Sequence, residues 1–142
     1  MKNGYSAYQT TTIETADQGK LILIAYDVAI KHCRLAIELM GTGADPADRN
    51  KHLYKAQDAI TELMSALRLD VGEIARNLYR LYEYMIFNLV QSVIKNNDTG
   101  AQEALRHLLT LREAWEVAVK TVKTANAGPV VTTPSRTFAM KG

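Results

Sequence analysis

The most informative part of the chain is the stretch Leu21-Ile22-Leu23-Ile24-Ala25-Tyr26-Asp27-Val28-Ala29-Ile30. It is apolar over most of the circumference of a helix. A surface helix of a small domain normally carries one apolar stripe. A helix that is apolar on several sides has to be covered on more than one of them. We expect the additional cover to come from the N-terminal arm, a second subunit or a partner protein, which points to binding rather than to chemistry.

Three further segments with helical periodicity follow this one, and short polar turns separate them. We expect helices over residues 17–40, 46–69, 70–95 and 101–127. Asp45-Pro46 is a strong start signal, since an N-cap residue precedes a proline at the first helical position. Asp70 with Glu73 has the spacing of a capping box and predicts that the third helix begins almost without a loop.

These four helices and their short turns predict an all-α fold, an antiparallel up-down-up-down four-helix bundle over residues 17–127. Residues 1–16 form a short N-terminal arm or cap, in which Gly4, Ser6 and the run of threonines from Thr10 disfavour an isolated helix. Residues 128–142 form a tail without helical period, which we expect to be extended. The length of 142 residues fits one domain with a proper core.

Several side chains have a specific structural expectation. Cys33 lies on an apolar line of the first helix and is expected to be a small core residue, as is Trp115 in the last helix. Asp27 and Lys31 are four residues apart on a polar stripe, which predicts an ion pair within the helix.

Composition excludes several classes of function. The net charge is +2, with 17 basic and 15 acidic residues that are dispersed, so we expect no nucleic-acid partner. No apolar run approaches the roughly 18 residues of a membrane span, and no signal peptide is recognisable, so we expect no membrane insertion. The single cysteine suits a reducing compartment. Together these features predict a cytoplasmic protein.

We find no constellation of residues that carries chemistry. Di-iron bundles need Glu-x-x-His on facing helices, and no glutamate here has a histidine three residues later. His32, His52 and His107 fall on three different helices and are expected to be solvated or capping side chains. We therefore predict no catalytic residue, metal or cofactor, and no enzyme activity.

Motifs in a fixed order carry a family resemblance over residues 5 to about 120. They are Tyr5 and Tyr8, Thr15-Ala16, Leu21-Ile22, Tyr26-Asp27, Lys55-Ala56-Gln57, Ile60, Leu63, Gly72, Ile74-Ala75, Asn77-Leu78, Leu81-Tyr82, Leu111-Arg112 and Ala114-Trp115. In these residues the chain resembles the flagellin-specific export chaperones of the FliS type.

This resemblance implies a non-enzymatic chaperone that binds the disordered C-terminal region of flagellin in the cytoplasm. Such a chaperone blocks premature filament assembly and helps deliver the subunit to the flagellar type III export gate. Our hypothesis for the partner site combines an N-terminal cap with a groove. The cap is Tyr5, Tyr8 and Ile13, and the groove is Leu21, Ile22, Tyr26, Asp27, Ala56, Ile60, Leu63, Leu78, Leu81 and Tyr82.

The residues alone leave one alternative from another class open. A structural interaction protein, whose extra apolar face closes a homodimer, explains the apolar helices equally well. For the arm, a permanent packing on the core is the alternative to a cap that gives way to the partner.

Overall fold

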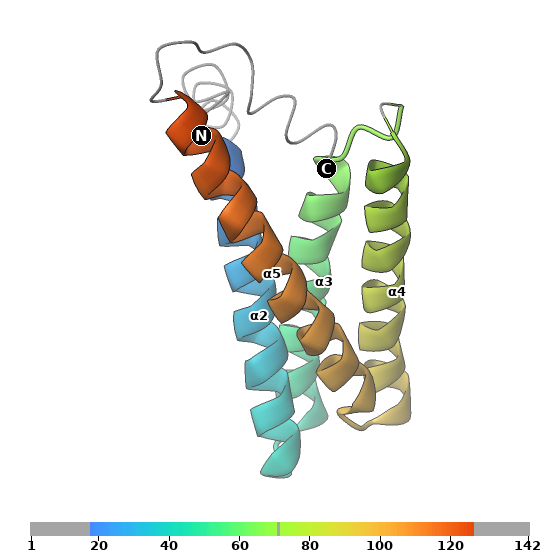
Figure 1. Ribbon diagram of the computed structural model, residues 1–142. Coiled ribbons are helices and arrows are strands. Elements are labelled where there is room, and N and C mark those ends of the chain that lie inside the picture. Colours follow the sequence, from blue (N-terminus) through green and yellow to red (C-terminus); the bar gives the residue numbers. More distant parts are fainter. Residues whose placement is uncertain (1–17, 71, 127–142) are drawn as a thin grey trace, which may run out of the picture.

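A computed structural model describes residues 18–70 and 72–126 of the chain (Figure 1). In these residues the chain forms four helices and no strand: α2 (Gln18–Gly41), α3 (Pro46–Ser65), α4 (Glu73–Lys95) and α5 (Thr99–Asn126). Consecutive helices run in opposite directions, which confirms the all-α, antiparallel four-helix bundle (Figure 1). The expected arm and tail lie outside the described residues.

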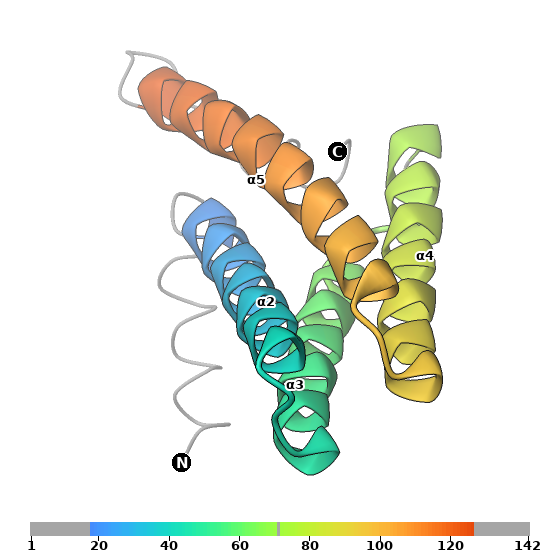
Figure 2. The same cartoon turned by 90° about the horizontal axis from the view of Figure 1, so that it is seen from below.

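Each helix packs against two neighbours around the bundle. α2 contacts α3 and α5, and α4 contacts the same two helices, so α2 and α4 lie diagonally across the core (Figure 2). The largest fully buried side chains come from all four helices: Tyr26, Cys33, Leu53, Ile60, Tyr82, Met85, Leu89, Ser92 and Leu108. The predictions of a buried Cys33 and of Trp115 in the core are confirmed, with Trp115 only 7% exposed.

One helix start agrees with the sequence signal and another does not. Asp45 accepts a hydrogen bond from the backbone amide of Ala47 at 3.1 Å and Pro46 is the first residue of α3, as predicted. The capping box at the start of the third helix is wrong, because Gly72 is the N-cap and makes no side-chain cap bond. Asp70 is two positions too early to cap a helix that begins at Glu73, and its carboxylate instead meets Arg68 at 3.5 Å.

The end of the second helix was also predicted too late. α3 ends at Ser65, where the amides of Ala66 and Leu67 bond to the carbonyls three residues before them and close the last turn. The chain then leaves the helix while Leu67 still packs against the core. The apolar spacing that predicted the helix therefore continues to Leu67, although the helix has ended. A side chain can be buried without helical backbone.

Two glycines set the path of α5, which leans from α4 at its beginning toward α2 at its end (Figure 1). At Gly100 a Cβ atom would lie 1.9 Å from the carbonyl oxygen of Asn88, so only glycine allows this approach to α4. The buried Ser92 hydroxyl accepts a hydrogen bond from the amide of Ala101 at 2.8 Å at the same place. Near the other end, a Cβ on Gly19 would lie 2.7 Å from Val119.

Candidate functional site

A groove between α2 and α3 has an apolar wall, unlike a hollow of about 610 Å³ over α4 and α5 that polar side chains line. The groove has a volume of about 440 Å³, and its α2 side is formed by Leu21, Ile24, Ala25 and Val28. A smaller hollow of about 180 Å³ shares Leu21 and Ala25 and continues to Ala66 at the end of the bundle. Leu21, Ile24 and Val28 are 47%, 49% and 38% exposed, so α2 presents an apolar row to solvent.

This row explains the unusual apolar circumference of the first helix. The inner face of α2 packs in the core, and α3 and α5 cover its two flanks. In the described residues nothing covers Leu21, Ile24 and Val28. Exposed apolar surface that is concentrated in a groove is typical of a partner site.

The predicted groove residues divide into exposed and buried ones. Leu21 lies in the groove, and Ile22 and Leu63 line the smaller hollow from their buried positions. Leu78 and Leu81 on α4 are half-buried and pack against the core. The remaining apolar candidates are core side chains in this structure, namely Tyr26, Ala56, Ile60 and Tyr82. The proposed cap residues Tyr5, Tyr8 and Ile13 lie outside the described residues.

Tyr26 and Tyr82, the tyrosines of two family motifs, meet at the centre of the bundle. Their hydroxyl oxygens lie 2.5 Å apart in a hydrogen bond, and Trp115 bonds to the same pair. Burial raises the pKa of both hydroxyls, that of Tyr82 to about 12, so both side chains remain neutral. The arrangement closes a buried polar network across three helices.

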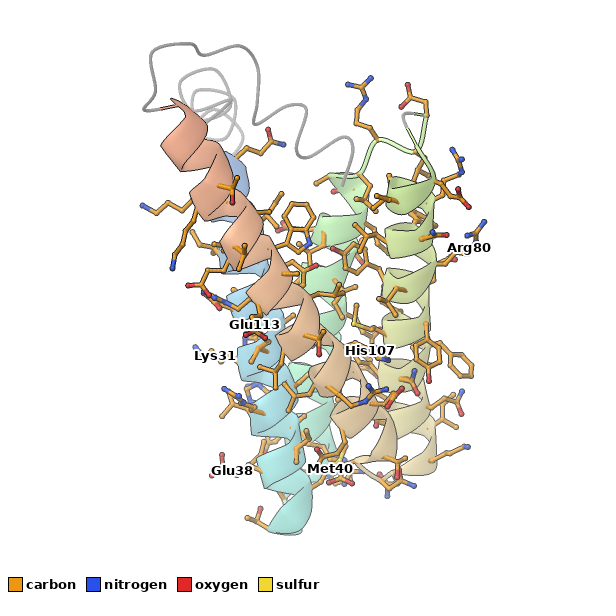
Figure 3. The ribbon with its side chains drawn as sticks, viewed as in Figure 1. Lys31, Glu38, Met40, Arg80, His107 and Glu113 are labelled. Carbon is orange, nitrogen blue, oxygen red and sulfur yellow. The ribbon has the colours of Figure 1, made fainter. Side chains whose placement is uncertain are left out.

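Asp27 has a different partner from the predicted one. Its carboxylate accepts two hydrogen bonds from the Arg112 guanidinium on α5, at 2.7 and 3.4 Å, and the described residues show no ion pair with Lys31. Lys31 instead extends from α2 into solvent (Figure 3). The tertiary pair prevails because a guanidinium can bond both oxygens of one carboxylate. Asp27 therefore links α2 to α5, on the flank away from the groove.

The prediction that each histidine is solvated or capping is also wrong. His32 and His52 pack together across α2 and α3 with Nδ1 atoms 2.9 Å apart, at the groove end that His32 lines. Burial lowers the pKa of both imidazoles, and Lys31 and Lys55 add to this effect. Nothing in the sequence placed these two histidines side by side, because the contact depends on the register of two helices.

His107 belongs to a second cluster, between α5 and α4 (Figure 3). Its Nε2 lies 3.1 Å from the Glu103 carboxylate, which also accepts hydrogen bonds from Arg106 and from the Tyr84 hydroxyl. These donors, with Arg106 the strongest, lower the pKa of Glu103 to about 2. A carboxylate with so many donors has a structural role and joins α4 to α5.

Arg49 is a buried residue that the sequence analysis missed. It is 7% exposed at the start of α3, and its Nε and Nη2 atoms have no hydrogen-bond partner among the described residues. Its place in the helical period, four residues before the buried Leu53, was the only available signal.

The described residues contain neither a cluster of three potential metal ligands nor a helix that is long and apolar enough to cross a membrane.

Comparison with known proteins decides the family. The family model described as flagellar protein FliS matches residues 1–122. The chain belongs to the FliS family. This family consists of chaperones for flagellar export and not of enzymes.

Three curated FliS relatives are named flagellar secretion chaperones. The Bacillus subtilis protein is 33% identical over 120 residues, which cover 84% of this chain and 89% of the relative. The Salmonella typhimurium FliS is 32% identical over 124 residues, covering 80% and 88%. The Vibrio cholerae FliS is 26% identical over 121 residues, covering 82% and 88%.

Proposed function

We propose that this FliS-family chain binds the disordered C-terminal region of flagellin in the cytoplasm. By holding that region, it prevents premature polymerisation and aids delivery of the subunit to the flagellar export gate. The observation that carries the proposal is the exposed apolar row of Leu21, Ile24 and Val28 along the α2–α3 groove.

The groove fits a client that becomes ordered when it binds. A disordered segment loses conformational entropy on ordering, and burial of apolar surface has to offset that loss. An amphipathic helix laid into an apolar groove is a common way to achieve this. The groove and the adjoining hollow extend over several turns of α2, from Gln18 to His32.

The N-terminal arm is proposed as a cap for this groove in the free protein. α2 begins at Gln18, which itself lines the hollow at the end of the groove, so the arm is covalently joined to α2 beside the groove. Tyr5, Tyr8 and Ile13 supply the apolar side chains of the arm. Deletion of residues 2–12 should raise client affinity. Unchanged affinity with a large loss of stability would instead indicate permanent packing.

Calorimetric titration with a peptide of the last 40 or so residues of the flagellin from the same bacterium tests the main proposal. We expect saturable one-to-one binding with a negative heat-capacity change, because apolar surface is buried. Ile24→Glu should weaken binding at least tenfold. Val117→Glu, which changes a residue on α5 that is 63% exposed, is the matched control and should bind as the original protein does.

The Asp27→Asn variant tests whether Asp27, a residue of the family motif, contributes to peptide binding in the groove. Because Asp27 bonds to Arg112 on the flank away from the groove, this variant should keep its affinity for the peptide. If the peptide does not bind, or binds the Ile24→Glu variant equally well, the proposed groove is wrong.

A homodimer remains the second candidate, and the outer face of α4 favours it. Phe87 and Ile94 are 57% and 69% exposed and are seven residues apart, so they share one face of that helix. Sedimentation of the dilute protein tests it. A dimer that Phe87→Glu dissociates would support this candidate, whereas a monomer that binds one flagellin peptide would exclude it.

A further inference from the structure

The two walls of the α2–α3 groove differ in chemistry. The α2 wall is the apolar row already described, whereas the α3 wall carries the exposed charges of Lys55, Asp58 and Glu62. These three residues are spaced by three and four, so they lie on one side of α3. In the described residues none of the three takes part in a salt bridge. Their charges are therefore available to an occupant of the groove.

The charges on this wall are ordered along the groove. Glu62 lies beside Leu21, near the end of the bundle where α2 begins, because both residues line the smaller hollow there. Lys55 lies toward the other end, one turn from His52, which contacts His32. Asp58 stands between them, and Lys51 adds a second exposed positive charge one turn beyond Lys55. The wall is thus negative at one end and positive at the other.

We propose that this charge order sets the direction and the charge pattern of the helix that the groove accepts. The occupant is an amphipathic helix with its N-terminal end beside Glu62 and its C-terminal end beside Lys55, parallel to α2. Its apolar stripe lies on Leu21, Ile24 and Val28. On the flank that faces α3, basic side chains come first, opposite Glu62 and Asp58, and an acidic side chain follows, opposite Lys55.

The helix dipole favours the same direction. The N-terminal end of a helix carries a partial positive charge and the C-terminal end a partial negative charge. A helix parallel to α2 brings its positive end to Asp58 and Glu62 and its negative end to Lys55. The opposite direction places like charges together at both ends. The stretch from Leu21 to His32 spans about 16 Å, which corresponds to about three helical turns.

The inference rests on the proposed function, since it assumes that the groove receives a helix of the client. It goes further because it assigns specificity for the direction of the bound helix to three charged residues, which are separate from the apolar row that contacts its apolar stripe. Exposed ion pairs are individually weak, and each reversal should change affinity by about two- to fivefold at low salt. The effect should vanish at about 0.5 M salt because of screening.

Two designed helical peptides of identical composition test the direction with the full-length protein. Both carry the same apolar stripe, but one has lysines in its first turns and glutamates in its last turns, and the other has the reverse order. We expect the first peptide to bind about tenfold more tightly at low salt. The preference should invert in the triple variant Lys55→Glu/Asp58→Lys/Glu62→Lys.

Glu83→Lys is the control for a charge change elsewhere, since Glu83 is exposed on α4, and it should keep the original preference. Ile24→Glu should weaken both peptides if they occupy the groove. Equal binding of the two peptides, or a preference that the triple variant does not invert, overturns the inference.

The flagellin peptide separates this inference from the proposed function. If that peptide binds and Ile24→Glu weakens it, but reversal of the three charges changes nothing, the charge order is irrelevant and only the inference fails. If the designed peptides discriminate as expected and the flagellin peptide does not bind, the groove recognises directed helices but the proposed client is wrong.

Discussion

The hydroxyl groups of Tyr26 on α2 and Tyr82 on α4 form a hydrogen bond of 2.5 Å at the centre of the bundle. The two helices lie diagonally across the core, so this bond is one of the few direct links between them. Both rings are fully buried, at 0% and 1% exposure, and neither hydroxyl can turn to water. The sequence hypothesis placed these tyrosines in the client site, but in this structure they hold helices together.

Replacing one tyrosine of this pair by phenylalanine should destabilise the protein. Tyr82→Phe removes one of the two partners of the Tyr26 hydroxyl and leaves only Trp115, and loss of one buried hydrogen bond costs about 0.5–1.5 kcal/mol. The double variant Tyr26→Phe/Tyr82→Phe should lose less than the sum of the single losses. Urea unfolding measures these differences, with Tyr54→Phe at an exposed position as control. Strictly additive losses would show that the two hydroxyls are not coupled.

Gly100 should not tolerate a side chain. A Cβ atom at this position would meet the backbone oxygen of Asn88 at 1.9 Å, and a backbone group cannot rotate away. Gly100→Ala should therefore lower the free energy of unfolding by about 1–3 kcal/mol. Gly41→Ala is the matched control, since no atom lies within 4 Å of its added Cβ, and it should change stability by less than about 0.5 kcal/mol. Equal stability of the two variants would contradict the close approach of α5 to α4.

The His32–His52 pair should make stability dependent on pH. The folded protein lowers the pKa of both imidazoles below the ordinary 6.5, so between these values the unfolded chain binds more protons than the folded one. Stability should therefore be highest above about pH 6.5 and fall as the pH drops toward the lowered pKa values. Lys31, Lys51 and Lys55 oppose protonation, and only Asp48 favours it.

Thermal unfolding of the original protein and of His52→Asn, measured from pH 8 to pH 5, checks this dependence. The asparagine keeps a neutral donor near the Nδ1 position, so the variant should lose less stability on acidification. His107→Gln, which leaves the pair intact, should follow the original protein more closely than His52→Asn does. Parallel curves for the original protein and His52→Asn would exclude the pair as the source of the effect.

Arg49 should be replaceable by an apolar side chain of similar length. Its Nε and Nη2 atoms are buried without partners in the part of the chain that the structure describes, which is unfavourable for a charged group. Arg49→Met should keep the packing of the stem and raise the free energy of unfolding by about 1 kcal/mol. Chemical denaturation measures this change, with Arg34→Met at an exposed position of α2 as control. A loss of stability in Arg49→Met would mean that the guanidinium contributes favourably.

Local signals in the sequence were sufficient to predict the number, type and order of the helices. The alternation of apolar positions, the Asp45-Pro46 start and the polar turns are local features, and a local signal is enough to define a helix and its partner-facing side. The same signals identified Cys33 and Trp115 as core residues. The capping box at Asp70 failed because local spacing alone does not reveal where tertiary packing ends the preceding helix.

Which side chains meet depends on how the helices pack against one another. The Tyr26–Tyr82, Asp27–Arg112 and His32–His52 contacts each join two helices, so they depend on helix register and on the tilt that Gly19 and Gly100 allow α5. The packing also determines which face of α2 remains uncovered. The sequence showed that α2 has more apolar side chains than one buried face needs. Only the packing of α3 and α5 showed that Leu21, Ile24 and Val28 are the ones exposed to solvent. The apolar pattern of a helix indicates how much of its surface has to be buried. The helices that pack against it in space determine which part of that surface they cover.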